Sequence, residues 1–317
     1  MDAVPPTQEA VAGDGLQVFD LAGAIRVGVD VHGAGMGGAP DGFDILLSTA
    51  PAAPRPWVSV AAAQLDDLVA ELAAAAARTP VAAAVMAQVL RLGAGLAFNE
   101  ALILESLAYS TLLAGAEFRA WRAGTPVRTR APSEGPRVRL AREDGVLVVA
   151  FARSEARNAV DAAMRDELVE ALAFAAVDPE QTPVLLTGDG PSFSAGGDLD
   201  EFGKATDPAA AHTIRVAQSP TRLLRELGQR GSARVHGACI GAGIEIPAAA
   251  ARVTATPDAW FRLPEVAMGL IPGAGGTASI PRRIGRERTC FMALSGRAID
   301  VSTALAWGLV DAVGDAP

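Results

Sequence analysis

Two short segments of the chain follow the same pattern, in which an apolar approach leads into a turn of small residues and then a helix-like continuation. They are SFSAGGDLDEF at residues 192–202 and HGACIGAGIEI at residues 236–246. Glycine and alanine at such a turn let a ligand lie close against the backbone, because no bulky side chain intervenes. Two turns of this kind in one domain predict that two backbone N–H groups converge on one acceptor.

The residues around these turns alternate between strand-like and helix-like segments. Strands are predicted in GVLVVAFA, TPVLLTG, SARVHGACI and RVTATPDAWFRLPEV; helices are predicted in DAAMRDELVEALAFAA, with Leu168 and Leu172 facing inward, in SPTRLLREL, and from near Ala242 onward. This order requires crossover connections, so it predicts a layered α/β domain over residues 138–317. The Pro- and Arg-rich residues 124–137 are interpreted as a linker that precedes this domain.

Strand signals also occur in residues 1–60, which are predicted to form an N-terminal extension with short strands. IRVGVDV and FDILLST are separated by the glycine-rich HGAGMGGAPDG. A phosphate-binding loop would need a strand–GxxxxGK–helix context, which is missing, so a plain hairpin loop is expected there. The acidic, proline-rich residues 1–15 lack the features of a signal peptide and are expected to form a disordered lead-in.

Residues 61–123 change character and predict about three helices, over 61–78, 80–93 and 99–114. Apolar positions that share one helix face are Leu65, Leu68, Val69 and Leu72 in the first helix, and Val81, Val85 and Val89 in the second. Pro80 suits the first turn of a helix, and Asn99 suits an N-cap. Taken alone, this block is predicted to be a small packed subdomain with no chemistry of its own.

Composition excludes several classes of protein. Half of the 317 residues are hydrophobic and 20% are charged, as in a globular protein, and the net charge of −9 argues against nonspecific binding to nucleic acid or to an anionic membrane. The most apolar run, VAAAVMAQVLRLGAGLAF, is interrupted by Gln88 and Arg91, so it predicts a core helix and not a membrane span. No membrane partner is therefore expected, and a cytoplasmic location is expected.

The cysteines and histidines show no pattern of a metal or redox site. Cys239 and Cys290 lie in apolar runs and are predicted to fill the core. The three histidines, His32, His212 and His236, are far apart, and neither HExxH nor CxxC occurs, so no metal site is expected.

Residues 138–317 resemble the crotonase superfamily, also called the enoyl-CoA hydratase/isomerase family. The motifs that carry the resemblance are SEARNAV, SFSAGGDLDEF, HGACIGAGIEIP, FRLPEVAMGLIPGAGGT and ALSGRAIDVSTALAWGLVDAV, in the family's order over about 180 residues. The resemblance implies a ββα spiral core, an acyl-CoA thioester substrate and a homotrimer or dimer of trimers. It implies no separate cofactor, because coenzyme A is part of the substrate.

The resemblance also implies site residues. The N–H groups of Gly197 and Ala242 would form an oxyanion hole for the thioester oxygen, which becomes negative as the reaction passes through an enolate. Glu245 would activate a water molecule, Glu265 would protonate the substrate, and the N–H of Gly273 would help to hold the water. The turn residues Ala195, Gly196 and Asp198 are assigned to substrate binding, and Asp198 is also expected to cap or brace a following helical turn.

Two small departures from the family pattern leave this chemistry in place. His236 stands where asparagine is more usual and is expected to be a satisfied core histidine. Ala242 stands where glycine is frequent, but only its N–H is needed.

A larger departure concerns the helices that follow GLVDAV in family members, where they cover the active site and build the trimer. This sequence ends at Pro317, whereas residues 61–123 resemble those helices. A circular permutation is therefore expected, with the helices joined to the core by residues 124–137. Tyr109, Leu112 and Phe118 would then lie near the thioester site or the trimer interface.

The function expected from these observations is hydration of a 2-enoyl-CoA. An isomerase that moves a double bond through the same enolate with one glutamate is the first alternative. Thioester hydrolysis, C–C cleavage and cofactor-free oxygenation stay open, as does a non-enzymatic binding subunit that kept the fold. The presence of two glutamates, Glu245 and Glu265, favours hydration, because addition of water needs a base and an acid.

Overall fold

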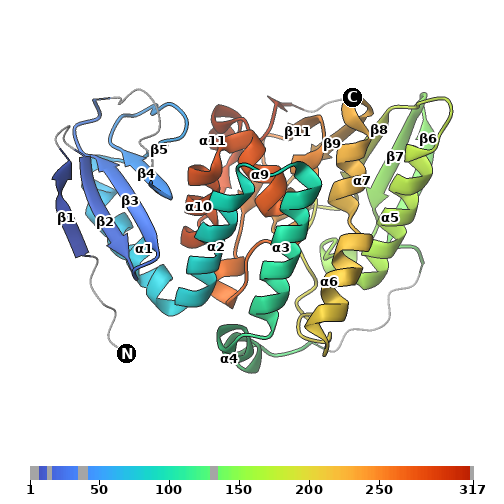
Figure 1. The fold of residues 1–317 in the computed structure, drawn as a ribbon. Coiled ribbons are helices and arrows are strands. Elements are labelled where there is room, and N and C mark those ends of the chain that lie inside the picture. The colour runs from blue at the N-terminus through green and yellow to red at the C-terminus, as the bar shows by residue number, and fades with distance from the viewer. Residues whose placement is uncertain (1–6, 13–15, 35–41, 129–134, 315–317) are drawn as a thin grey trace.

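The computed structural model describes residues 7–12, 16–34, 42–128 and 135–314, with side chains from residue 16 onward. Its C-terminal half contains a six-stranded sheet in the order β14-β11-β9-β8-β7-β6 (Figure 1). The strands are β6 (Val138–Glu143), β7 (Val146–Phe151), β8 (Val184–Gly188), β9 (Gly231–Val235), β11 (Arg252–Ala255) and β14 (Ala312–Val313). All neighbours pair in parallel except β6 and β7. The predicted α/β domain is confirmed, and β6 is an addition that the sequence patterns did not predict.

The predicted strand SARVHGACI divides at Gly237 into β9 and β10 (Ala238–Ile240). Gly237 has a φ of +53°, and a Cβ there would lie 2.3 Å from the carbonyl oxygen of Pro191, so only glycine fits this bend. After the bend, β10 joins a second sheet with β12 (Trp260–Arg262) and β13 (Ile299–Asp300). The bend therefore carries the second small-residue turn away from the large sheet.

Helices connect the strands of the C-terminal half, and the first of them, α5 (Ala162–Ala176), packs against β6 and β7 of the large sheet. The others are α6 (Pro208–Ala217), α7 (Pro220–Glu226), α8 (Ala242–Glu245), α9 (Gly276–Ile284), α10 (Arg286–Ser295) and α11 (Val301–Trp307). Asp161 caps α5 by accepting the Met164 N–H, and Leu168 and Leu172 are fully buried as predicted. The helix expected from Ala242 is α8, which is only one turn long. Helices α6, α9, α10 and α11 were not predicted.

An additional five-stranded sheet precedes these elements, in the order β1-β2-β3-β4-β5. Its strands are β1 (Thr7–Ala12), β2 (Leu16–Leu21), β3 (Ile25–Asp30), β4 (Ile45–Ser48) and β5 (Val58–Ser59). The expected hairpin between IRVGVDV and FDILLST is wrong, because β3 and β4 pair in parallel. The connection is long enough to return the chain to the start of the next strand, which a parallel pair requires. Residues 35–41 of that connection lie outside the described residues.

The expected disordered lead-in is also wrong in part. Residues Thr7–Ala12 form strand β1, which pairs antiparallel with β2 and so satisfies the backbone groups along that side of β2. Residues 1–6 and 13–15, the rest of that prediction, lie outside the described residues.

The block 61–123 forms three helices near the predicted positions and adds a fourth. They are α1 (Leu65–Arg78), α2 (Pro80–Gly93), α3 (Phe98–Leu113) and α4 (Ala116–Gly124). The apolar face predicted for α1 is buried, but Val81 of α2 is exposed. Asn99 is not the N-cap of α3; that position is Ala97, whose N–H donates to the Glu100 side chain. The linker 124–137 begins at the last residue of α4, and its residues 129–134 lie outside the described part.

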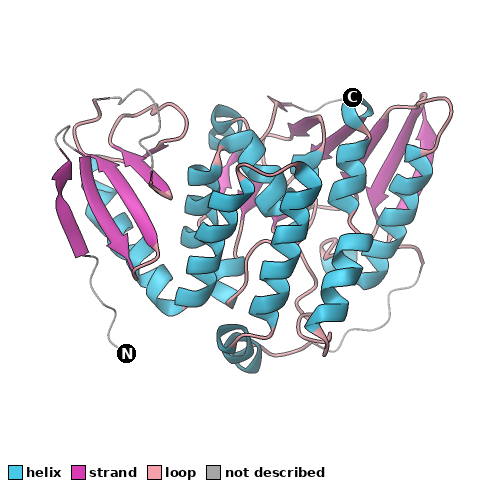
Figure 2. Ribbon diagram, viewed as in Figure 1, coloured by secondary structure: helices cyan, strands magenta, loops and turns pink. Residues whose placement is uncertain are grey.

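These helices pack on the C-terminal domain and do not form a detached subdomain. Figure 2 shows them between the N-terminal sheet and the large sheet. Helix α3 lies against α6 and α9, and α1 and α2 lie against α10. The Thr79 hydroxyl donates to the Val266 carbonyl, and Arg288 of α10 donates to the carbonyl of Trp57, just before β5. Among the described residues no single helix has the length and apolarity to cross a bilayer. Two pairs of consecutive helices have that length and apolarity only when taken together, and they are bent by 105° and 64° at the break between them.

Cys239 and Cys290 are both buried and unbridged, as predicted for core residues. His236 has its Nε2 2.8 Å from the Gly190 carbonyl oxygen, so it has the expected partner. It is only half-buried, however, so the prediction that it is a core residue is wrong.

Candidate active site

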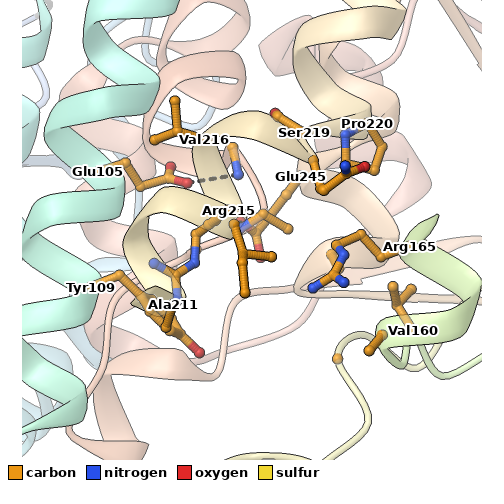
Figure 3. A pocket seen from close by; sticks show the side chains of 18 of the residues that line it. Glu105, Tyr109, Val160, Arg165, Ala211, Arg215, Val216, Ser219, Pro220 and Glu245 are labelled. Atoms are coloured by element: carbon orange, nitrogen blue, oxygen red, sulfur yellow. Dashed lines mark hydrogen bonds between the residues drawn. The ribbon is translucent and has the colours of Figure 1, made fainter. Parts of the chain in front are cut away.

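A cavity of about 500 Å³ opens between α3, α6 and the two small-residue turns (Figure 3). Its wall includes Gly197 and Asp198 from the first turn, Ala242 and Glu245 from the second, and Glu265 and Gly273 from the segment after β12. The sequence-predicted residues that do not line it are Ala195 and Gly196, which lie behind the first turn. The fold thus brings together segments that are far apart in the sequence, from Asn99 in α3 to Gly275 before α9.

The two turns are packed directly against each other. Ser194 donates its N–H to the Ala238 carbonyl, and Ile240 donates back to the Ser194 carbonyl. A Cβ at Gly196 would lie 2.7 Å from the Ile240 oxygen, and a Cβ at Gly243 would lie 2.6 Å from the Ser194 oxygen. Only glycine permits this approach, which is the local reason for the small residues in both motifs.

The N–H groups of Gly197 and Ala242 are available to a ligand at this junction. Neither N–H donates to an acceptor among the described residues, and both residues line the cavity. Because buried backbone donors are normally paired, two adjacent free donors on a cavity wall indicate a place for a polar ligand atom.

Asp198 lines the cavity, but it mainly braces the first turn from beneath. Its Oδ2 accepts a hydrogen bond from Arg153 Nη1 at 2.8 Å, and Oδ1 accepts the Asp200 N–H. The same guanidinium lies 3.2 Å from Asp161. The residues after Asp198 form turns, and the next helix begins only at Pro208, so the expected helical turn is absent there.

Glu245 is buried at the C-terminal end of α8 and is oriented by the glycine-rich segment before α9. Its Oε2 accepts the N–H groups of Ala274 and Gly276 at 2.8 and 2.9 Å. Burial and, next, the neighbouring Glu265 raise the pKa of Glu245, while the two N–H donors favour its ionised form. The carboxylate is therefore held through Oε2, and Oε1 stays available to a ligand in the cavity.

Glu265 is buried beside Glu245. A Cβ placed on Gly241 would lie 2.4 Å from Glu265 Oε1 and 3.7 Å from Glu245 Oε1, so both carboxyl oxygens lie close to Gly241. Glu265 Oε2 has no hydrogen-bond partner among the described residues. Burial raises the pKa of Glu265 to about 8, so this carboxyl group is mostly protonated at neutral pH. The two carboxyl groups thus have different environments and can hold different protonation states.

Comparison with known proteins agrees with this arrangement. The sequence pattern of the enoyl-CoA hydratase/isomerase family matches residues 141–316, which is more than half of the chain. The chain belongs to the enoyl-CoA hydratase/isomerase family. Members of this family act on acyl-CoA thioesters, so membership implies a substrate of that class.

Three relatives of this family illustrate the extent of the similarity. The 2,3-dehydroadipyl-CoA hydratase of Escherichia coli is 36% identical over 174 residues, 55% of this chain and 68% of the relative. A mevalonyl-coenzyme A hydratase of Beauveria bassiana is 33% identical over 52% of this chain and 62% of its own. The crystal structure of an enoyl-CoA hydratase from Thermoplasma volcanium is 27% identical, with a TM-score of 0.51 over 58% of this chain and 73% of that chain. The match thus spans about two thirds of these relatives.

Helix α3 contributes a third buried carboxyl group that the sequence analysis missed. Glu105 accepts hydrogen bonds from the N–H groups of Gly275 and Thr277 and from the Thr277 hydroxyl, all at 2.7 Å. Figure 3 shows Glu105 on the cavity wall with one of these bonds marked. Burial raises its pKa to about 7, which these hydrogen bonds partly offset. The signal that could have found it is an acidic residue within the apolar run ALILESLA. The block 61–123 therefore contributes residues to the cavity wall.

Tyr109, one helical turn after Glu105, packs against the same glycine-rich segment. A Cβ at Gly273 would lie 2.3 Å from the Tyr109 ring, so the ring covers Gly273 directly. The N–H of Gly273 donates to no acceptor among the described residues and so stays open for a ligand. Of the other residues expected near the site, Phe118 lies against Gly203 and Gly269, and Leu112 is buried in the core.

This contact predicts that Gly273→Ala is destabilising. The new methyl group would overlap the Tyr109 ring, and overpacking of this kind typically costs about 1–3 kcal/mol. Urea unfolding should show that loss, and Tyr109→Leu should relieve much of it in the double variant. Additive losses in the double-mutant cycle would contradict the direct contact.

Proposed function

We propose that the protein is an enoyl-CoA hydratase that adds water across the double bond of a 2-enoyl-CoA. The observation that carries the proposal is that two buried carboxyl groups, Glu245 and Glu265, both line the cavity and both lie beside Gly241. Hydration needs a base for the water and an acid for the substrate, and the two environments suit those roles. Two relatives that are 36% and 33% identical over about half of this chain are named hydratases, which supports the same reaction here.

In this mechanism the substrate carbonyl oxygen accepts the N–H groups of Gly197 and Ala242. Glu245 Oε1 takes a proton from a water molecule, held in part by the Gly273 N–H, while the water oxygen bonds to Cβ of the substrate. The π electrons move to the thioester, and the resulting enolate oxygen is stabilised by the two N–H donors. Glu265 then gives its proton to Cα. One proton remains on the carboxyl pair, and its return from Glu245 to Glu265 restores the enzyme.

The isomerase alternative needs only one carboxyl group that removes and returns a proton. The second carboxyl group would then be an unexplained buried acid, since Glu265 Oε2 has no partner among the described residues. That orphaned oxygen favours hydration, because a proton donor in the resting enzyme must aim its O–H at the substrate.

Incubation of the purified protein with enoyl-CoA thioesters of different chain lengths tests the proposal. Mass spectrometry should show 3-hydroxyacyl-CoA, one water heavier than the substrate. Formation of an isomeric enoyl-CoA of unchanged mass would contradict it.

The proposed oxyanion hole predicts a large effect of Ala242→Pro. Proline at the first position of α8 is compatible with a helix, yet it removes the N–H donor. Loss of one oxyanion donor typically reduces kcat about 10²–10³-fold. The matched control is Ala242→Ser, which keeps the N–H and should keep most of the activity. Equal activity in the two variants would contradict the assignment of the Ala242 N–H to the oxyanion hole. Gly197 is less suitable for this test, because any Cβ there would overlap the Phe202 ring.

We also infer that α1–α4 take the place of the C-terminal helices of relatives, as in a circular permutation. The family match begins at residue 141 and leaves about a third of each relative uncovered, while α3 lies over the site. A homotrimer or dimer of trimers, as in the family, is part of this proposal.

Removal of residues 1–123 should therefore give an insoluble or inactive protein, because Glu105 and Tyr109 are lost with the helices. Expression of residues 124–317 with light scattering and a hydration assay measures this. A soluble, active fragment would contradict the proposed role of the helices.

A further inference from the structure

Arg215 of α6 is a cation in the cavity wall that the proposed hydration does not use. Its Nη1 donates to the hydroxyl groups of Ser106 and Ser110, both at 3.1 Å. Its guanidinium lies over the Tyr109 ring, with 4.4 Å between Cζ and the ring centroid, and Figure 3 shows it extending from α6 toward Tyr109. In the described part of the chain no carboxylate lies within ion-pair distance of it.

The other arginines of the cavity wall differ from Arg215 in this respect. Arg165 pairs with Asp166 at 2.7 Å, and Arg222 pairs with Glu226 at 2.8 Å. Arg215 is half-buried, and a desolvated guanidinium without a counter-ion is unfavourable. A bound anion would supply the missing charge.

The buried Glu105 does not supply this charge. Its carboxyl oxygens are already held by Gly275 and Thr277, and it forms no ion pair with Arg215. With its pKa raised to about 7, Glu105 is also partly protonated at neutral pH. The positive charge of Arg215 is thus only weakly balanced by the protein.

Arg215 lies close to the place where the acyl part of a substrate would bind. Its guanidinium stacks on Tyr109, and the same ring lies against Gly273, whose neighbour Ala274 donates its N–H to Glu245. Arg215 is therefore separated from the reacting centre by little more than one aromatic ring. A group that binds Arg215 while the thioester occupies the oxyanion hole must lie only a few carbon atoms from the double bond.

We propose that Arg215 is the anion subsite for a carboxylate at the far end of a short acyl chain, so that the preferred substrate is the CoA monothioester of an unsaturated dicarboxylic acid. The planar guanidinium presents fork-like donors that match a carboxylate. The Nε and Nη2 atoms make no hydrogen bond within the described residues and are free for this purpose. The inference rests on the proposed function, because it concerns the acyl chain of the same substrate.

Binding measurements on saturated CoA esters test this subsite without relying on catalysis. The probes are three pairs of equal chain length: succinyl- and butyryl-CoA, glutaryl- and pentanoyl-CoA, and adipyl- and hexanoyl-CoA. Calorimetry with the full chain should show that in at least one pair the carboxylated ester binds at least tenfold more tightly. Arg215→Gln should abolish that preference and leave the affinity for the methyl-terminated ester unchanged.

Arg282→Gln is the matched control. Arg282 also stacks on an aromatic residue of α3, Phe98, and donates to backbone carbonyls, but it lies outside the cavity. This variant should keep the preference. If Arg215→Gln weakens both members of each pair and free CoA equally, the residue is structural or binds a CoA phosphate, and the subsite is wrong.

Equal binding of both members of every pair by the wild-type protein would overturn the subsite and leave the hydratase proposal standing, and this readout needs no variant. Failure of all six esters to bind would overturn the hydratase proposal as well.

Discussion

Glu265→Gln should reduce kcat for hydration about 10²–10⁴-fold, the usual contribution of a positioned acid or base. Glutamine fills the same volume but cannot donate the proton to Cα. Glu245→Gln should cause a loss of similar size, because the amide cannot accept the proton of water. The pre-steady-state hydration of one enoyl-CoA by each variant measures the chemical step.

The binding of a saturated acyl-CoA is the control for these two variants. Both carboxyl groups act on the transition state more than on the bound substrate, so the dissociation constant should change little. A variant that loses binding and turnover in the same proportion would have a damaged pocket. Full hydratase activity in either variant would contradict the assignment.

Glu105→Ala should destabilise the fold by about 3–5 kcal/mol, as is typical for removing one partner of a buried charged group. The variant leaves the N–H groups of Gly275 and Thr277 and the Thr277 hydroxyl without their acceptor. For a protein of this size the melting temperature should fall by about 10 °C. Activity should fall as well, because the same glycine-rich segment orients Glu245.

Glu100→Ala is the matched control for Glu105→Ala. Glu100 lies in the first turn of the same helix and accepts only the Ala97 N–H at the surface, so its loss should cost about 1 kcal/mol or less. If the two variants unfold at the same temperature, α3 does not hold the site through Glu105.

The sequence of the C-terminal half predicted several of its strands and helices, because the spacing of buried apolar residues differs between helices and strands. Leu168 and Leu172 repeat at helical spacing, and the apolar runs of β7 and β8 suit strands covered on both faces. Strand β6 was missed because it is mostly exposed and rich in charged residues. Its place in the sheet is determined by its pairing with β7, which cannot be predicted from the residues of β6 alone.

The N-terminal sheet shows the same limit of local pattern. Each strand signal in residues 16–60 was recognised, but whether β3 and β4 run parallel or antiparallel depends on the path of the connection. The glycine content of that connection indicated only that a turn was possible.

The site was predictable where chemistry coincides with a short motif. The two small-residue turns and the two glutamates lie within the motifs that carry the family resemblance, and the fold brings them to one cavity. Glu105 and Arg215 belong to helices far away in the sequence, and their roles come from the residues that face them. A carboxylate on an apolar helix face was visible in the sequence, but its partners at Gly275 and Thr277 were not.

The most direct test of the central claim is a double-label experiment on the purified protein with a short 2-enoyl-CoA. If Glu245 directs water to Cβ and Glu265 protonates Cα, hydration in a mixture of heavy-oxygen water and deuterium oxide places one heavy oxygen at Cβ and one deuterium at Cα of the same product. Mass spectrometry with fragmentation locates both labels. Deuterium in recovered or isomerised enoyl-CoA with no heavy oxygen at Cβ would contradict the account.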